Sequence, residues 1–126
     1  MARILVIEDN DANMELMAYL LRAFGHMVQE AVEGQAGLQL ARYGPPDLIL
    51  CDLQMPGMDG YEVVQRMKVN LPNIPVIAVT AYAMVGDRDK VLAAGFDGYI
   101  PKPINPETFV GEIEAFLPTN LRLGKI

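Results

Sequence analysis

The sequence predicts an α/β fold in which helices cover both faces of a five-stranded parallel sheet. Short apolar runs bounded by turn residues alternate with segments whose apolar residues recur every three or four positions. The first pattern is typical of strands buried on both faces, and the second of amphipathic helices. Because five strands alternate with five helices, we expect the strands to run parallel and the helices to return the chain across the sheet.

The central strand is the most clearly marked of the five. An unbroken apolar run at residues 48–51 ends on the carboxylate of Asp52, and a turn rich in Pro and Gly follows at residues 55–60. Pro and Gly this close together end a strand and begin a loop. Asp52 is therefore expected at the carboxyl end of a central strand, where open α/β sheets bind their ligands.

The remaining elements follow from the same two patterns. We expect Asp11 to be the N-cap of the first helix and Gly25 to end that helix as a left-handed cap. The predicted strands are residues 3–7, 27–31, 48–52, 76–79 and 98–100. After the first helix, the predicted helices are residues 34–43, 61–69, 85–94 and 106–117.

Right-handed crossover connections leave few ways to wind such a sheet. The simplest is the flavodoxin-like order 2-1-3-4-5. Under this winding, polar side chains that follow four different strands emerge on one rim of the sheet. They are Glu8, Asp9, Asp52, Thr80 and Lys102.

Carboxylates brought close together repel one another, so either one keeps a proton or a cation neutralises them. A cluster of oxygen ligands without His or Cys favours a hard ion, and a few carboxylates completed by water suit Mg²⁺ better than Ca²⁺. Lys102 would add a positive charge and Thr80 a hydroxyl donor. These groups are the ones needed to transfer a phosphoryl group onto a carboxylate, with an aspartyl phosphate as product.

Four segments of the chain resemble the receiver domains of two-component response regulators. They are VIEDND at residues 6–11, DLILCDLQMPGMDGYEV at 47–63, AVTAYA at 78–83 and GYIPKPI at 98–104. Their order and spacing extend the resemblance along the chain to Leu117. Among receivers, the chain looks most similar to stand-alone ones of the CheY or DivK kind and to those fused to hybrid histidine kinases. The resemblance implies the CheY-like form of the flavodoxin-like sheet.

The resemblance also implies a phosphoacceptor and a Mg²⁺ site. Asp52 would accept the phosphoryl group and ligate the ion, and Asp9 would ligate the ion directly. Glu8 stands where many family members have Asp, and it would act mainly through a coordinated water. The backbone carbonyl of Gln54 would complete the protein ligands.

A conformational switch is implied as well. Lys102 and Thr80 would each bind a phosphoryl oxygen, and the ring of Tyr99 would turn inward as Thr80 moves toward the phosphate. Phosphorylation would thereby shift an equilibrium that exists without it. The Lys102–Pro103 peptide bond is expected to be cis. The implied partner-binding face is the fourth helix, fifth strand and fifth helix, with candidate contacts from Met84, Val85, Tyr99, Pro101 and Ile104.

Composition narrows the class of partner. The net charge of −6 over 126 residues argues against sequence-independent binding of nucleic acid or anionic lipid and favours protein partners or small ligands. The resemblance implies a phosphohistidine donor, on a sensor histidine kinase or a histidine phosphotransfer protein, and a downstream protein target. A single cysteine and the lack of an apolar run near the ~20 residues needed to span a bilayer lead us to expect a cytoplasmic protein without membrane contact.

Residues 1–117 are expected to form one receiver domain. Residues 118–126 are expected to be a C-terminal tail, and a free tail, the start of a linker and a cloning remnant are all compatible with this sequence. His26 follows the end of the first helix, and we expect it at the surface. Tyr99 has a plain structural interpretation, a half-buried strand aromatic, beside its role as a switch.

Two other functional classes remain open. A Mg²⁺-dependent phosphohydrolase would also use an aspartyl nucleophile, but enzymes of the haloacid dehalogenase type carry a second Asp where this chain has Gln54. A receiver-like binding module that takes no phosphate is opposed by the presence of Asp9, Asp52, Thr80 and Lys102 together. We therefore expect a signalling switch that is not an enzyme, because it would catalyse only its own phosphorylation and dephosphorylation.

Overall fold

The sheet has the predicted strands in the predicted order. The structure is a computed structural model that describes residues 1–81 and 85–122, with residues 85 and 86 described only as part of a helix. Five strands pair in parallel in the order β2-β1-β3-β4-β5. The strands are β1 (Arg3–Ile7), β2 (Met27–Ala31), β3 (Leu48–Asp52), β4 (Val76–Thr80) and β5 (Gly98–Pro101).

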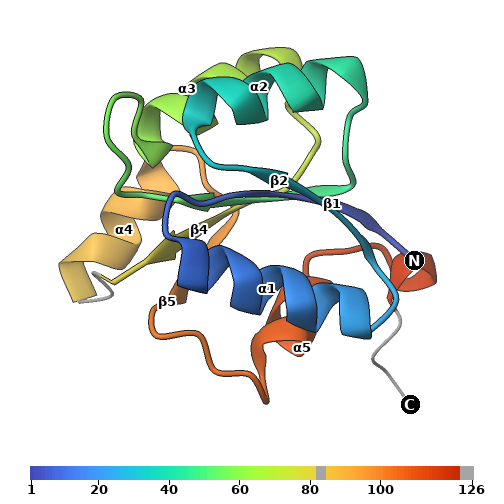
Figure 1. The fold of residues 1–126 in the computed structure, drawn as a ribbon. Helices are drawn as coiled ribbons and strands as arrows, with labels where there is room; N and C mark the ends of the chain where they lie inside the picture. The colour runs from blue at the N-terminus through green and yellow to red at the C-terminus, as the bar shows by residue number, and fades with distance from the viewer. Residues whose placement is uncertain (82–84, 123–126) are drawn as a thin grey trace.

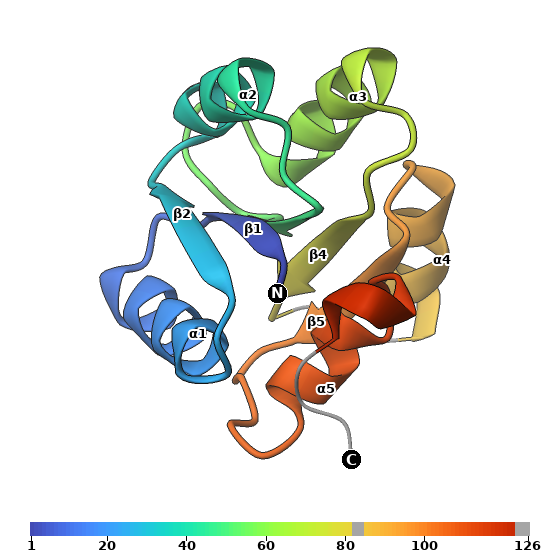
Figure 2. The same ribbon diagram turned by 90° about the vertical axis from the view of Figure 1, so that its right-hand side faces the viewer.

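Helices cover both faces of this sheet, as predicted. Helices α1 and α5 lie against one face, and α2, α3 and α4 lie against the other (Figures 1 and 2). The helices are α1 (Asp11–Ala23), α2 (Gly34–Tyr43), α3 (Gly60–Asn70), α4 (Val85–Ala93) and α5 (Phe109–Glu114), followed by a short 3₁₀ helix, η1 (Thr119–Leu121). None of the helices described in residues 1–81 and 85–122 is long and apolar enough to cross a membrane.

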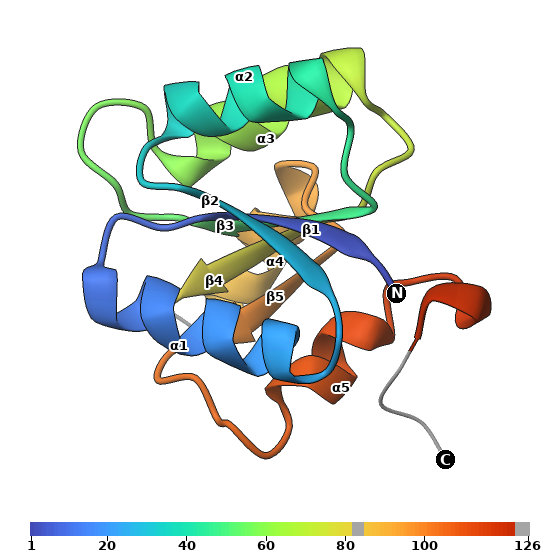
Figure 3. The same cartoon turned by 45° about the vertical axis from the view of Figure 1, so that its right-hand side comes forward.

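The core has two apolar layers, one on each side of the sheet. Met17 and Phe109 are fully buried in the layer under α1 and α5, and Val63 and Met67 are almost fully buried in the layer under α2, α3 and α4. Every residue of β3 and β4 is buried, which explains their unbroken apolar runs. Because all strands are parallel, their carboxyl ends lie at one edge of the sheet (Figure 3).

The N-cap of α1 is Asn10 and not Asp11, so the prediction is wrong by one residue. Asn10 has an extended backbone, and its side-chain oxygen accepts a hydrogen bond from the Asn13 N–H at 2.9 Å. Asp11 is instead the first helical residue, where its carboxylate faces the positive end of the helix dipole. Both residue types cap helices well, and the pattern of apolar residues does not choose between them.

Helix α5 is shorter than predicted, because the chain approaches it through a turn. The N–H groups of Thr108 and Phe109 both donate to the Asn105 carbonyl, at 3.2 Å and 3.0 Å, and the Asn105 side chain accepts from the Glu107 N–H at 3.0 Å. After α5, the Arg122 guanidinium donates to the Leu117 carbonyl at 3.0 Å. In the predicted tail, Leu121 packs against the core layer under α1 and α5, and Arg122 is held to the residues that follow α5.

His26 is buried, contrary to the expectation of a surface position. Its Nδ1 accepts a hydrogen bond from the Ala2 N–H at 3.0 Å, and its Nε2 lies 2.7 Å from Glu114 Oε2. Since Nδ1 is an acceptor, the ring proton is on Nε2 and points to the carboxylate. A buried imidazole with both nitrogens satisfied links the N-terminal strand to α5, and the sequence around His26 carries no sign of either partner.

Left-handed and close-packed positions are occupied by glycine. Gly25 and Gly95 have positive φ angles of 97° and 114° after α1 and α4. Gly60 lies at the start of α3, where a Cβ would be 2.6 Å from the Asp52 carbonyl oxygen and 2.8 Å from the Leu53 Cα. Those atoms are backbone, so they could move aside only by displacing the end of β3.

We predict that Gly60→Ala lowers the free energy of unfolding by about 1–3 kcal/mol, because the added methyl group pushes α3 away from the end of β3. The matched control is Gly111→Ala in α5, where a Cβ would meet nothing within 4 Å. Ala is expected to stabilise the protein there by roughly 0.5–1 kcal/mol, through its higher helix propensity. Urea unfolding followed by circular dichroism measures both, and equal stabilities would contradict the close approach at Gly60.

Candidate functional site

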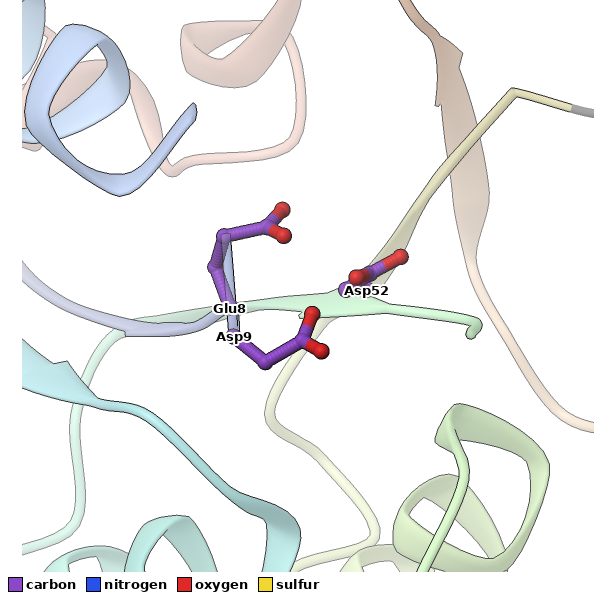
Figure 4. Close-up of side chains that lie close together, drawn as sticks. All are labelled: Glu8, Asp9 and Asp52. Carbon is purple, nitrogen blue, oxygen red and sulfur yellow. The ribbon is translucent and has the colours of Figure 1, made fainter. Parts of the chain in front are cut away.

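Three carboxylates meet at the carboxyl ends of β1 and β3. Ile7 lies beside Cys51 in the parallel register, so the next residue on each strand, Glu8 and Asp52, follows at neighbouring strand ends. Oxygen atoms of Glu8, Asp9 and Asp52 all lie within 4.8 Å of one another. Figure 4 shows the carboxylates of Glu8 and Asp9 extending from the end of β1 toward Asp52. The structure thus brings three of the predicted site residues together.

The three carboxylates differ in their exposure to water. Glu8 is fully buried and Asp52 is only 4% exposed, whereas Asp9 is exposed. Alternation along β1 and β3 directs Glu8 and Asp52 to the sheet face covered by α1 and α5. The cluster is therefore closed around Glu8 and open to solvent at Asp9.

Lys102 places its ammonium group against the cluster from beyond the end of β5. Its Nζ lies 3.2 Å from Glu8 Oε1, 3.3 Å from Glu8 Oε2 and 3.4 Å from Asp52 Oδ1. The Lys102 N–H donates to the Thr80 carbonyl at 2.7 Å, which holds this segment against the end of β4. The Lys102–Pro103 peptide bond is cis, as expected. One ammonium group cannot balance three ionised carboxylates.

Burial and repulsion change the acidity of two of the carboxyl groups. The pKa of Glu8 rises from 4.5 to about 7, chiefly because burial penalises the charged form, and further because Asp52 hydrogen-bonds to it and repels it. The pKa of Asp9 also rises, from the same causes in the same order. Near neutral pH, without a cation, Glu8 is therefore only partly ionised.

The cluster fits a divalent cation. Glu8 Oε1 lies 3.2 Å from the Lys102 ammonium nitrogen but has no hydrogen-bond partner within the described part of the chain. A buried oxygen in this state is expected to have an unseen partner, such as an ion or a water. Octahedral Mg²⁺ with oxygens at about 2.1 Å separates neighbouring ligands by about 3 Å and opposite ones by about 4 Å. Carboxylate oxygens within 4.8 Å of one another match that spacing with small side-chain movements, so Glu8, Asp9 and Asp52 are the residues that would hold Mg²⁺.

Of the other predicted site residues, Gln54 contacts the cluster, while Thr80 and Tyr99 lie on β4 and β5. The Gln54 N–H donates to Asp52 Oδ1 at 3.2 Å, which brings the Gln54 peptide next to the carboxylates. Thr80 is fully buried at the end of β4, one residue beyond the register partner of Asp52. Tyr99 is half-buried beside Ala78, and alternation places its ring on the same sheet face as Thr80.

The predicted partner contacts are only partly accessible. Pro101 is exposed and Tyr99 half-exposed, as a binding surface requires. Ile104 is 6% exposed and packs into the core layer under α1 and α5, so its assignment to that surface is wrong. Its aliphatic side chain is more stable out of water than on the surface. Met84 lies outside the described residues, as does the side chain of Val85.

One contributor to the site was missed. The Asn10 N–H donates to Glu8 Oε2 at 3.2 Å and stabilises the charged form of this carboxyl group, which partly opposes the rise of its pKa. Because a backbone N–H makes this contact, no residue type could have indicated it. The one available signal was the position of Asn10 between a strand end and a helix start, where backbone donors are left unpaired.

Comparison with known proteins identifies the family. Residues 4–114 match the family described as the response regulator receiver domain. A relative from Brucella ovis, named polar-differentiation response regulator DivK, is 41% identical over 116 residues that cover 90% of this chain and 94% of the relative. The DivK protein of Brucella abortus strain 2308 matches to the same extent.

Solved structures agree with this assignment. The chemotaxis protein CheY4 of Vibrio cholerae superposes with a TM-score of 0.88 at 27% identity, covering 93% of this chain and 99% of CheY4. A CheY-like receiver domain protein of Methanospirillum hungatei superposes with a TM-score of 0.84 at 30% identity, covering 91% and 92% of the two chains. The chain therefore belongs to the response regulator receiver domain family, and its function is that of a phosphorylation-activated signalling switch.

The raised pKa of Glu8 predicts how stability depends on pH in the metal-free protein. Folded Glu8 binds its proton more tightly than unfolded Glu8, so this residue should make stability fall as the pH rises from 4.5 to about 7 and stay at the lower level above that. Glu8→Gln should remove this contribution. Urea unfolding in EDTA at pH 5.5 and pH 8 compares the two proteins, and the same pH dependence in both would contradict the raised pKa.

Proposed function

We propose that Asp52 accepts a phosphoryl group from a phosphohistidine, assisted by Mg²⁺ and Lys102. The observation that supports this most directly is the set of contacts around Asp52. Oxygens of Glu8 and Asp9 lie within 4.8 Å of an Asp52 oxygen, and Lys102 Nζ lies 3.4 Å from Oδ1. A carboxylate that lies next to both a cation site and an ammonium group is suited to attack a phosphoryl group.

The reaction makes one bond and breaks one. An oxygen of the Asp52 carboxylate attacks phosphorus, the P–N bond to the donor imidazole breaks, and the leaving imidazole takes up a proton. When bound, Mg²⁺ supplies positive charge to the phosphoryl oxygens and to the carboxylates around them. We assign Asp9 as a direct ligand, Glu8 as a ligand mainly through water, and the Gln54 carbonyl as a further ligand.

Lys102 and Thr80 are proposed to bind phosphoryl oxygens. The Lys102 ammonium already lies against both Glu8 and Asp52, so a phosphoryl group on Asp52 would meet it after a small movement. Such preorganised charge lowers the barrier because little reorganisation is needed during the reaction. Thr80, on the neighbouring strand end, is proposed to donate its hydroxyl hydrogen to a second oxygen.

The proposed output is a change on the surface formed by α4, β5 and α5. Tyr99 is half-buried on the same sheet face as Thr80, so a movement of Thr80 toward the phosphate would open space for its ring. Phosphorylation would favour one of two existing arrangements. Of the candidate contacts, Tyr99 and Pro101 remain. Met84 and the side chain of Val85 lie outside the described structure.

The proposed partners are proteins in the cytoplasm. The donor would be a sensor histidine kinase or a histidine phosphotransfer protein, and the target a downstream protein that binds the altered surface. The net charge of −6 suits protein partners better than nucleic acid. The chain would catalyse only its own phosphorylation and dephosphorylation, and Gln54 in place of a second Asp disfavours a phosphohydrolase.

We predict that acetyl phosphate and Mg²⁺ add one phosphoryl group to the protein and that Asp52→Asn abolishes the addition, because the amide is not a nucleophile. The matched control is Asp59→Asn, which changes an exposed N-cap of α3 to another good N-cap residue. Intact-mass spectrometry measures the added group. Labelling of Asp52→Asn at the wild-type level would contradict the assignment.

Measurements of Mg²⁺ binding and of phosphate release, made beside the labelling experiment, separate the other two functions. A wild-type protein that binds Mg²⁺ but takes up no phosphoryl group would indicate a binding module. Steady release of phosphate from phosphate monoesters would indicate a hydrolase. Both results would contradict the proposed function.

We predict that Lys102→Gln slows phosphorylation by about 10²-fold, because a positive charge near the developing negative charge is lost. Mg²⁺ binding should persist, since the ammonium competes with the ion for Glu8 and Asp52. The rate is measured by intact mass over time, and Mg²⁺ binding by the rise in melting temperature. A variant that labels at the wild-type rate would exclude Lys102 from the reaction.

A further inference from the structure

A groove between α2 and α3 takes no part in the proposed phosphoryl transfer. Its volume is about 570 Å³, which is within the range of protein binding sites. The floor is apolar and comes from Leu38 and Ala41 on α2 and from Met67 and Leu71 at the end of α3. Ala41 and Met67 are buried, and Leu38 and Leu71 are half-buried.

The polar residues of the groove carry positive charge and no negative charge. Arg42 on α2 and Arg66 on α3 line it from the two helices, and the other polar lining residues are the amides Gln35 and Asn70. The whole chain has 16 Asp and Glu against 10 Lys and Arg. A groove with two arginines and no carboxylate therefore differs in charge from the chain as a whole.

Both guanidinium groups are available to a ligand. Arg42 is exposed and makes no ion pair within residues 1–81 and 85–122. Arg66 pairs with Glu62 at 2.7 Å, but the two side chains are 56% and 44% exposed. An exposed pair one helical turn apart contributes little to stability, so Arg66 can turn to another carboxylate at small cost.

The shape of the groove suits a helix. Its α2 side extends from Gln35 to Arg42, a length of about 10 Å along the helix axis. Apolar anchors at i, i+4 and i+7 of a bound helix cover the same length. Val69 also lines the groove and is 80% exposed, so the apolar surface extends beyond the floor.

We propose that this groove binds an acidic amphipathic helix of a partner protein. The apolar face of that helix lies on Leu38, Met67 and Val69, and carboxylates on its two flanks pair with Arg42 and Arg66. The complementary charges exclude a basic segment and orient an acidic one. The proposal concerns a surface other than the α4, β5 and α5 face and does not depend on phosphorylation.

The position of the groove separates it from the acidic site. Helix α3 contributes residues from Arg66 onward, in its C-terminal half, whereas the end of β3 adjoins the start of α3, where the Gly60 N–H donates to the Leu53 carbonyl at 3.0 Å. A partner bound in the groove leaves Asp52 and β5 accessible. This docking therefore tethers the switch while its phosphorylation and output proceed.

The test uses the ¹⁵N-labelled protein and two synthetic helical peptides. One is rich in Ala, with Leu at i, i+4 and i+7 and Glu on both flanks; the other has Lys in place of each Glu. We expect the Glu peptide alone to shift amide signals, mainly of residues 35–42 and 66–71. Asp52→Asn should bind it equally, which keeps this test independent of phosphoryl transfer.

Variants distinguish recognition of charge from nonspecific hydrophobic binding. Arg42→Glu should weaken the Glu peptide at least tenfold and allow the Lys peptide to bind. Val69→Glu, a change at an 80% exposed side chain, should also weaken the Glu peptide. Arg88→Glu on α4 is the control and should leave its affinity unchanged.

Four results would overturn the proposal. The first is equal binding of both peptides, and the second is signal shifts on the α4, β5 and α5 surface instead of the groove. The third is groove shifts produced by added laurate, a small amphiphile, but not by the Glu peptide. The fourth is groove shifts that grow with protein concentration when no peptide is added. The third would indicate a site for small amphiphiles, and the fourth a contact between copies of this chain.

Discussion

The arrangement depends on one electrostatic constraint: Glu8, Asp9 and Asp52 are held together against the ammonium group of Lys102. Parallel strands impose this, because β1 and β3 are hydrogen-bonded neighbours and end at the same edge. Packing around Glu8 excludes water, so repulsion is relieved by a proton or a cation. The raised pKa of Glu8 follows from this cause, and so does the state of its Oε1, which has no hydrogen-bond partner among residues 1–81 and 85–122. We therefore expect this cluster to gain stability when a divalent ion neutralises its charge.

Much of this could be predicted from the sequence. Asp52 ends an unbroken apolar run, and such runs mark the central strands of a parallel sheet. Once the strands are parallel and the crossovers right-handed, the winding brings residues 8, 9, 52, 80 and 102 to one edge. The site was therefore predictable because it depends on backbone topology and not on side-chain detail. The same reasoning explains why element positions were found and the ends of α5 were not.

What escaped prediction depends on contacts between distant side chains. His26 is buried because Ala2 and Glu114, far apart in the chain, satisfy both ring nitrogens. Ile104 follows the strand end that carries Lys102, yet its aliphatic side chain packs into the core. No short stretch of sequence indicates the groove between α2 and α3. Arg42 and Arg66 line the same groove only because both helices pack on β1 and β3. The spacing of apolar residues predicts which face of each helix is buried. It does not predict which grooves form between the exposed faces of neighbouring helices.

The most direct measurement is paramagnetic broadening of the amide NMR spectrum by Mn²⁺, which occupies Mg²⁺ sites. At substoichiometric Mn²⁺, the amide signals of Asp9, Asp52 and Gln54 should broaden first, and excess Mg²⁺ should restore them. Asp9→Asn should remove the effect at all three positions, since a cation site needs its carboxylates. Broadening spread over other exposed acidic residues, or left unchanged in Asp9→Asn, would contradict a cation held among these three carboxylates.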